Sequence, residues 1–474
     1  MQENYYTRIG LEIHIQLKTK TKLFCGCKNE YGAIPNTNVC PVCLGYPGVL
    51  PVLNQEAVKM AIKVALALNA RINKRSRFYR KNYFYPDLPK GYQITQYSES
   101  IAEDAFLEIT VHDESKRIEI ERMNIEEEAA RSIHTPQGEV LLDFNRSGIP
   151  LLEIVTKPCI SSPIEAKLFL EKFRDYIRYL KISDCDMEKG ELRVDANISL
   201  SLDPNTYGTK VELKNLNSFK AVYDALTFEK ERQEKLLKEG KKIHQETRMW
   251  DEYLGESRPM RTKEESMDYR YFPEPDLPVL ILDDKFIEEV KREMPELPDK
   301  KYARYVENYK LSPEQAKLIA FDREYSEFFD RISKEVKDKK LVANWLTVIF
   351  PAYIGKTHRF EDLDPVEFVR LAHALEIGEI NNNQAKEALT RFFEKGISIS
   401  KSIQEFEESS KKFDETELEK VIDEVLEEQR ELVEKYLSGK TGVFQAILGQ
   451  CMKKLKGSGD PIKVKEILER KLKG

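Results

Sequence analysis

The stretch from Arg8 to Leu17, RIGLEIHIQL, alternates apolar and polar side chains, and this pattern constrains the fold more than any other in the chain. Strict alternation is typical of a β-strand with one buried face, because successive side chains point to opposite sides. Glu12, His14 and Gln16 therefore share one face. A carboxylate and an imidazole about 7 Å apart along a strand are able to share a metal ion or a substrate. The solvated face of an edge strand would give the same pattern without a function.

Length and composition bound the class of protein. The 474 residues suffice for roughly two to four domains with a sizeable core. A formal charge of -6 gives no global basic signature of a nucleic-acid-binding surface. No run of 18 apolar residues occurs, and the first ten residues have neither the basic nor the apolar region of a secretory signal. We therefore expect a cytoplasmic protein without a membrane span.

Four of the seven cysteines form two close pairs, Cys25-Gly-Cys27 and Cys40-Pro-Val-Cys43. Such pairs on tight turns can bring four thiolates round one tetrahedral ion, and zinc is the usual occupant. The alternative is four free, buried thiols, but the intervening range 28–39 has little apolar content to bury. Four cysteine ligands leave no open coordination position, so the pattern predicts a structural zinc site and not a catalytic one.

Three later segments extend the polar face that the first strand predicts. Glu153 stands alone in the apolar run PLLEIV, and a buried carboxylate needs a metal, a substrate or a basic partner. Residues 192–202 and 211–214 alternate as a hairpin with one apolar face. Its other face carries ionic and amide groups of both signs: Arg193, Asp195, Asn197, Glu212 and Lys214. Together with Glu12 and His14, these groups predict a polar cradle over an antiparallel sheet.

Two charged stretches have a functional and a structural interpretation. Glu126, Glu127 and Glu128 follow a predicted strand, so one of them can turn inward, although three acids in a row are also typical of a solvated helix start. The range 71–97 interleaves basic residues, Lys81 and Lys90 among them, with aromatic ones. This mixture can hold phosphates and stack on bases, or it can form a packed loop with solvated cationic heads.

The second half of the chain is predicted to be helical. Six prolines between Pro259 and Pro298 disfavour a continuous helix and indicate a boundary near Met294. Short amphipathic patterns follow, and residues 452–474 are basic, which suits phosphates or a solvated helical face. We predict an α+β chain in three parts: an antiparallel-sheet cradle domain with helices over 1–293, including the cysteine loop 25–43, then an all-α helical domain over 294–405 and a tail domain over 406–474.

Several long phrases then occur in one colinear order: GLEIHIQL, the cysteine pairs, YPGVLPVLN, RKNYFYPDLPKGYQI, NRSGIPLLEIV, LRVDANISL, VELKNLNSF and DYRYFPEPDLP. Together they resemble the GatB subunit of the tRNA-dependent amidotransferase GatCAB. The resemblance covers nearly the whole chain, and GKTGVFQAILGQCMKK is similar to the tail domain of that family.

The resemblance implies an activity that spacing alone does not show. GatB-like proteins convert misacylated Glu-tRNA(Gln), and in many organisms Asp-tRNA(Asn), to the amide. ATP phosphorylates the side-chain carboxylate, and ammonia released from glutamine by a GatA-type partner displaces the phosphate. A GatC-type subunit wraps the two together. The cradle is then the kinase and transamidase site, and the helical and tail domains bind the tRNA.

The resemblance also implies site residues. It assigns Mg²⁺ to Glu12, His14 (directly or through water), Glu127 and Glu153, with Glu126 as the substitute for Glu127. Lys81 and Lys90 match lysines near the active site and the ammonia path, so the catalytic candidates are Glu127, Glu153, Lys81 and Lys90. The cysteines match the zinc-bearing form of the family; other members lack them, which favours a structural zinc. From strand parity alone we add, as nucleotide-binding candidates, Arg193, Asp195, Glu212 and Lys214.

Two other functions are open at this point. The chain can be a non-catalytic tRNA-binding scaffold whose acids are ordinary surface, or an autonomous ATP-dependent ligase that uses free ammonia. The sequence shows no Ser-cisSer-Lys arrangement of the amidase type and no N-terminal catalytic cysteine. We therefore expect that this chain alone does not use glutamine.

Overall fold

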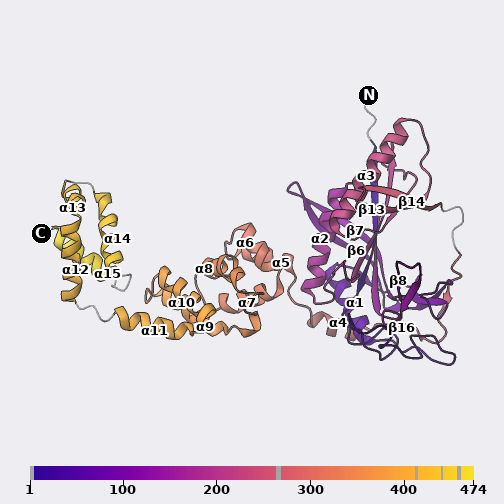
Figure 1. Cartoon of the computed structure of the whole chain (residues 1–474), viewed down its shortest axis with the longest axis horizontal. Coiled ribbons are helices and arrows are strands. Elements are labelled where there is room, and N and C mark those ends of the chain that lie inside the picture. Colours follow the sequence, from indigo (N-terminus) through magenta and orange to yellow (C-terminus); the bar gives the residue numbers. More distant parts are fainter. Residues whose placement is uncertain (1–4, 263–267, 411–414, 439–440, 456–460, 474) are drawn as a thin grey trace. The chain divides into compact units, whose positions relative to one another are not determined.

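The computed structural model describes residues 5–262, 268–410, 415–438, 441–455 and 461–473 (Figure 1). The chain divides into two compact units, Met1–Pro298 and Asp299–Gly474, which are treated separately below. The first unit combines a large sheet with helices, and the described part of the second unit is helical. The predicted α+β class is therefore confirmed. The domain limits at 293/294 and 405/406 stay predictions.

A twelve-stranded sheet forms the centre of the first unit. Its main path runs through β14 (Glu256–Thr262), β13 (Glu246–Asp251), β12 (Val211–Lys214), β11 (Leu192–Ser201), β1 (Tyr6–Gln16), β10 (Pro150–Thr156), β7 (Glu114–Glu127), β5 (Tyr92–Gln96), β4 (Phe78–Asn82) and β15 (Phe272–Pro273). Off this path, β6 (Ala102–Val111) pairs with β7, and β2 (Arg71–Ile72) pairs with β6. The described neighbours are antiparallel except β12 and β13, which are parallel.

The expected strand at the start of the chain is β1, and it lies inside the sheet, between β10 and β11. Its apolar side chains, among them Ile9, Leu11 and Ile13, are almost fully buried. Helices α2 (Pro163–Tyr179) and α3 (Phe219–Lys238) pack on each other and on β6 and β11 (Figure 1). β1 is therefore no edge strand, and one of its faces is core.

Local sequence signals explain where the helices of this unit begin. Asn54 caps α1 (Gln55–Ala67), and Ser162 accepts a hydrogen bond from the Glu165 amide with proline in the first turn of α2. Ser218 caps α3 in the same way. A fourth helix, α4 (Asp284–Arg292), packs on α1. The remaining strands form two small pairs: β3 (Arg75–Ser76) with β16 (Leu280–Ile281), and β8 (Arg131–His134) with β9 (Val140–Asp143).

The sheet register gathers the polar side chains on the second face of β1. Residues directly opposite each other in an antiparallel pair share a face. His14 is opposite Glu153 of β10 and Arg193 of β11, and Glu12 is opposite Asp195. The predicted polar cradle therefore consists of side chains from β1, β10 and β11, and β7 joins it through its pairing with β10.

The second unit has two hydrophobic clusters. One is formed by α5 (Pro298–Glu307), α6 (Pro313–Ala320), α7 (Arg323–Ser333), α8 (Lys339–Asn344), α9 (Pro365–Glu376), α10 (Asn382–Lys395) and α11 (Ile399–Ser410), with a π-helical turn at Trp345–Ile349 and 3₁₀ turns at Phe350–Ala352 and Phe360–Asp362. The other is formed by α12 (Glu415–Glu428), α13 (Arg430–Leu437), α14 (Phe444–Lys454) and α15 (Pro461–Lys473), with a 3₁₀ turn at Thr441–Val443. No helix of the described residues is long and apolar enough to cross a membrane.

Part of the basic tail is engaged within its own cluster. Lys454 pairs with Glu428 of α12 at 2.6 Å, and Lys471 pairs with Asp423 of α12 at 2.6 Å. Arg470 also contacts acidic groups of α12. The acidic and basic segments of the tail therefore neutralise each other in part.

The central position of β1 predicts a large effect of truncating its core face. Ile13→Ala should lower the free energy of unfolding of the first unit by about 2–5 kcal/mol, because Ile13 is fully buried and a cavity would replace it. Ile281→Ala is the matched control, since Ile281 is 64% exposed. The chain has two tryptophans, so in a Trp345→Phe background the fluorescence of Trp250 reports on the first unit alone during urea unfolding. Equal effects of the two substitutions would contradict the topology.

Candidate active site and metal centres

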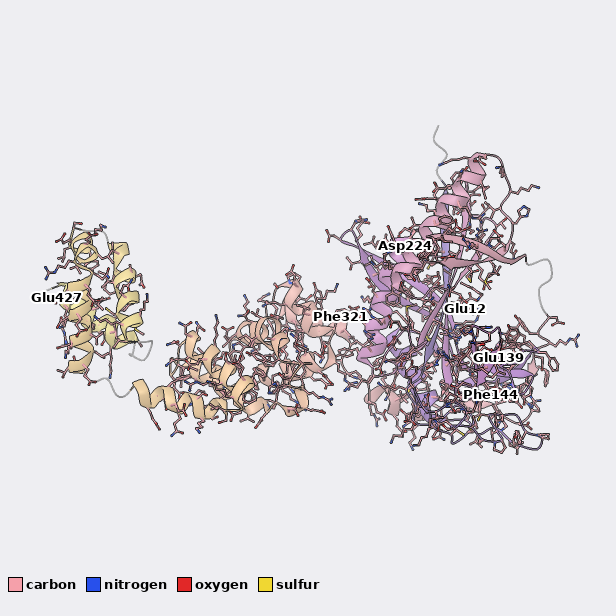
Figure 2. All side chains as sticks on the ribbon, in the orientation of Figure 1. Glu12, Glu139, Phe144, Asp224, Phe321 and Glu427 are labelled. Atoms are coloured by element: carbon pink, nitrogen blue, oxygen red, sulfur yellow. The ribbon has the colours of Figure 1, made fainter. Side chains whose placement is uncertain are left out.

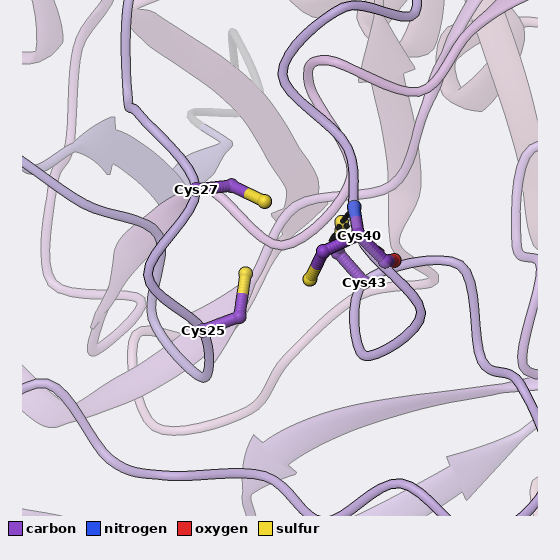
Figure 3. A group of neighbouring side chains, drawn as sticks. All are labelled: Cys25, Cys27, Cys40 and Cys43. Carbon is purple, nitrogen blue, oxygen red and sulfur yellow. Dashed lines mark hydrogen bonds between the residues drawn. The ribbon is translucent and has the colours of Figure 1, made fainter.

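The four paired cysteines come together in the structure. Each offers a sulfur, and the four sulfurs lie within 4.8 Å of one another. Figure 3 shows Cys25 and Cys27 facing Cys40 and Cys43 across the gap between two loop segments. Cys40 and Cys43 also approach each other directly, with 3.9 Å between their sulfurs. Four sulfur donors in one cluster fit a zinc ion, and they leave no coordination position on that ion for a substrate.

A fully buried lysine supports a negatively charged cysteine cluster. The Lys22 ammonium lies 3.6 Å from the Cys43 sulfur and donates to the Phe144 carbonyl at 3.1 Å. A buried ammonium is stable only beside compensating negative charge, which thiolates around a divalent ion supply. A hydrogen bond from Cys25 lowers the pKa of Cys43 to about 4, against the effect of burial. The charge of Lys22 acts on the pKa of Cys43 in the same direction.

A second group of metal-binding side chains lies on the polar face of the sheet. Glu12, His14 and Glu153 each offer a ligand atom, and these atoms lie within 4.8 Å of one another. Figure 2 labels Glu12 at this position on the sheet. The Nε2 atom of His14 is 3.9 Å from carboxylate oxygens of both Glu12 and Glu153, and 3.2 Å from Oε1 of Glu126. We call these four side chains the carboxylate cluster.

The carboxylate cluster concentrates negative charge in a confined place. Within the described part of the chain, His14 is the only ion-pair partner of its three carboxylates. Burial lowers the pKa of His14, but the hydrogen bond and charge of Glu126, with the charge of Glu153, outweigh burial and raise that pKa to about 9. Burial raises the pKa of Glu126, but His14 holds it below its usual value. Burial, then the charge of Glu126, raises the pKa of Glu153.

Two neutral residues hold the carboxylates in place. Asn124 of β7 donates to Glu153 at 2.8 Å, and Thr95 of β5 donates to Glu126 at 3.2 Å. The other side-chain atom of Asn124, Oδ1, is buried and accepts no hydrogen bond from the residues that the structure describes. Converging carboxylate oxygens beside an unused amide oxygen fit a hard divalent cation such as Mg²⁺. The carboxylate cluster and Asn124 therefore fit the Mg²⁺ ion that the resemblance implies.

The structure divides the predicted magnesium set. Glu126 and Glu127 are neighbours on β7, so their side chains point to opposite faces, and Glu126 is the one that joins His14. Glu127 instead forms an ion pair with Lys90 and accepts a hydrogen bond from the Ile94 amide at 2.9 Å. The pair lines a separate cavity of about 260 Å³ together with Cys43.

Lys81, the other predicted catalytic lysine, lies on β4 near the carboxylate cluster. Its charge lowers the pKa of Glu126. Its ammonium lies 4.8 Å from the ring centroid of Tyr269 and 5.8 Å from that of Tyr83, in cation–π contact. Next to it, Tyr97 and Tyr271 stack with 4.1 Å between centroids. Lys81 and Tyr83 of the predicted mixture therefore lie against Tyr269, which is outside the range 71–97.

The four candidates added from strand parity lie on the polar face and are engaged there. Arg193 donates to Glu128 at 2.6 Å. Lys214 pairs with Asp195 and, at 3.2 Å, with Glu212. Burial lowers the pKa of Lys214, but the charges of these two acids raise it above its usual value. A larger cavity of about 470 Å³ begins beside Gln16, two residues beyond His14, and includes Arg131 and Arg146.

Several residues of the site were not predicted from the sequence. Asn124 and Thr95 donate hydrogen bonds to Glu153 and Glu126. Glu128 accepts a hydrogen bond from Arg193, and the ring of Tyr269 contacts the Lys81 ammonium. Asn124 and Glu126 are two residues apart on β7 and therefore share one face of the strand. With the length of β7 known, this alternation would have favoured Glu126 over Glu127 as a residue of the site. Tyr269 approaches Lys81 from far along the chain, so no local pattern would have found it.

Comparison with known proteins places this arrangement in a family. Residues 7–288 match the model described as "GatB/GatE catalytic domain", and residues 327–472 match the "GatB domain" model. The chain belongs to the GatB family. The carboxylate cluster, the cysteines and both cavities lie within the part that matches the GatB/GatE catalytic domain. The resemblance in the sequence is thereby confirmed.

Curated relatives align over almost the full length. A protein of Thermodesulfovibrio yellowstonii, named as a subunit of aspartyl/glutamyl-tRNA(Asn/Gln) amidotransferase, is 43% identical over 473 residues, 99% of each chain. The proteins of the same name from Persephonella marina and Carboxydothermus hydrogenoformans are each 44% identical, over 98% and 99% of this chain and 99% of their own length.

The cysteine cluster predicts one zinc ion per chain. Purified chain should contain one equivalent of zinc by elemental analysis, and Cys27→Ser should lose most of it, because three ligands and a hydroxyl hold zinc weakly. Cys159→Ser is the matched control, since Cys159 lies outside the cluster. Equal zinc contents in both variants would contradict the assignment.

The carboxylate cluster predicts which glutamate supports divalent-ion binding. With Mn²⁺ as a spectroscopic substitute for Mg²⁺, Glu126→Gln should weaken binding by about tenfold or more, because it removes a charged oxygen beside His14. Glu127→Gln should bind Mn²⁺ like the wild type, since Lys90 already neutralises Glu127. Electron paramagnetic resonance titration measures both affinities. The reverse order would show that Glu127 is the ligand.

Proposed function

We propose that this chain is the synthetase and transamidase subunit of a glutamine-dependent tRNA amidotransferase. It uses ATP to phosphorylate the side-chain carboxylate of Glu on tRNA(Gln), of Asp on tRNA(Asn), or of both. It then transfers ammonia to give the amide. The observation that carries this proposal is the carboxylate cluster around His14, in a chain of the GatB family whose full-length relatives are named as subunits of aspartyl/glutamyl-tRNA(Asn/Gln) amidotransferase.

The chemistry explains why such a cluster is needed. A carboxylate is a poor electrophile, so ammonia attacks it only after one oxygen has become part of a phosphate leaving group. Transfer of a phosphoryl group between two anions needs positive charge to offset the developing negative charge. Mg²⁺ held by Glu12, His14, Glu126 and Glu153 would supply that charge. Lys81 and Arg193 add fixed positive charge beside the same carboxylates.

The remaining side chains divide the work in space. Arg193, Asp195, Glu212 and Lys214 form the polar floor on which we place the nucleotide, and the cavity beside Gln16 is of a size that holds a small molecule. Lys90 and Glu127 lie on the other side of β7, where they form an ion pair. We place this pair on the route by which ammonia reaches the acyl phosphate, and the zinc ion in the cysteine loop as a structural element.

The proposal assigns the chain to a complex. Because the sequence shows no glutaminase signature, the proposed source of ammonia is a GatA-type subunit, and a GatC-type subunit completes a heterotrimer. The helical and tail domains are the proposed tRNA-binding parts. We place the complex in the cytoplasm, where a reducing environment keeps free thiols available to a metal.

Separate assays of the two half-reactions test this proposal. With Glu-tRNA(Gln), ATP and ammonium chloride in the reconstituted complex, Glu126→Gln should lose about 100-fold or more of both tRNA-dependent ADP formation and Gln-tRNA formation, because the phosphoryl group loses its charge stabilisation. Glu127→Gln should keep tRNA-dependent ADP formation, which reports the phosphorylation step, and lose Gln-tRNA formation. Glu108→Gln, an exposed residue of β6, is the matched control.

The outcome also separates the alternative functions. A non-catalytic tRNA-binding scaffold would retain full turnover in all three variants, provided that tRNA binding is unchanged. An autonomous ligase would form product with ammonium chloride in the absence of the partner subunits. The first result would refute the proposed catalytic role of this chain, and the second would refute its dependence on partner subunits.

A further inference from the structure

We infer that Gly45, two residues beyond the cysteine loop, is a positioning residue for Lys90, so that the metal state of the four-cysteine site sets where the Lys90 ammonium lies. The zinc ion would then do more than hold a loop. The functional consequence rests on the role proposed above for the Lys90–Glu127 pair, but the positional claim does not.

The first observation is the contact between Gly45 and Lys90. A Cβ atom added to Gly45 would lie 2.5 Å from Cγ and 3.0 Å from Cα of Lys90. The Lys90 stem therefore rests directly on the Gly45 backbone, and any side chain there would displace it. Gly45 also has φ +69°, a conformation that favours glycine.

The second observation concerns the turn formed by residues 40–46, which we call the cysteine turn. Its hydrogen bonds hold Gly45 in place. The Gly45 amide donates to the Val42 carbonyl at 3.1 Å, and the Leu44 amide donates to the Cys40 carbonyl at 3.0 Å. The Tyr46 amide donates to Pro41 at 2.9 Å. Gly45 is thus part of the same hydrogen-bonded turn that carries Cys40 and Cys43.

The third observation concerns the other member of the ion pair. A Cβ atom added to Gly148 would lie 3.6 Å from Cβ of Cys43 and 4.0 Å from Oε2 of Glu127. The Cys43 carbonyl also accepts a hydrogen bond from Ser147 at 3.2 Å. Gly148 therefore lies beside both Cys43 and the Glu127 carboxylate.

Lys90 is the member of the pair that depends on this support. Glu127 belongs to β7, and its main chain and side chain are both tied to β5, through Gln93 at 2.8 Å and Ile94 at 2.9 Å. Lys90 stands in the loop between β4 and β5, whose Phe84 is 97% exposed. Among the described residues, the contacts that orient its ammonium are Glu127 and the ring of Tyr92, 5.4 Å away. A shift of the Gly45 backbone would move Lys90 and leave Glu127 in place.

The test compares two glycines of the same loop. Gly45→Ala puts a methyl group into the Lys90 stem, whereas Gly48→Ala introduces the same strain at φ +85° with no described atom within 4 Å of the new methyl group. The full-length chain is briefly acetylated with acetic anhydride, and peptide mass spectrometry measures the rate at each lysine. Lys90 is 11% exposed and ion-paired, so it should react slowly in the wild type. Lys220, which is 78% exposed, serves as the internal standard.

We expect acetylation of Lys90 to rise severalfold in Gly45→Ala, with zinc content unchanged, and to stay at the wild-type rate in Gly48→Ala. Removal of zinc from the wild type by a chelator should raise it as well, and zinc added back should restore it. This second measurement decides the matter if Gly45→Ala does not fold. An unchanged Lys90 rate after zinc removal, or equal rates in the two glycine variants, overturns the inference.

Activity measurements then test the proposed function separately. A misplacement of about 1 Å can cost on the order of 100-fold in rate, so amide formation should fall in Gly45→Ala while tRNA-dependent ADP formation persists. A faster Lys90 acetylation with full amidation would support the positional inference and refute the role of Lys90 in amide formation.

Discussion

The pairing of β1 with a strand on each side is the constraint on which the rest of the structure depends. Its apolar side chains enter the core, and this fixes the register, because a slip of one residue would turn them all to the opposite face. The same register brings the second face of β1 together with those of β10 and β11. His14 and Glu153, far apart in the chain, are thus directly opposite each other. The energy that holds the site together is therefore the burial of Ile9, Leu11 and Ile13 on the other face of the strand.

The alternation of side chains along β7 places neighbouring charged groups in two different environments. On one face of β7, Glu126 lies next to His14. The repulsion between the carboxylates there is offset by the positive charge of the His14 imidazolium or of a bound cation. On the other face, Glu127 lies next to Lys90, where the two charges cancel. Consecutive residues on a strand thus serve two separate environments. This separation is the basis of the different outcomes proposed for substitutions at the two glutamates.

The cysteine loop connects structural stability with this second environment. Small loops with little apolar content have no core of their own, and a metal replaces it. The buried Lys22 beside Cys43 shows that this loop is built around negative charge. Because Gly45 follows Cys43 by two residues and its backbone contacts the stem of Lys90, the cysteine site and the ion pair are neighbours.

The sequence by itself determined the alternating strands at 8–17, 192–202 and 211–214, their polar faces, the cysteine pairs, the helix start at Ser162, and the family. These depend on side-chain alternation, capping and motifs, which are local. Only the tertiary structure decided that Glu126 and not Glu127 faces His14, because this depends on where β7 ends and on its pairing with β10. Only the tertiary structure brought Tyr269 to Lys81 and Gly45 to Lys90, since these contacts join segments distant along the chain. Parity along one strand is a property of the sequence, whereas the partner that a side chain meets is set by the register of all strands together.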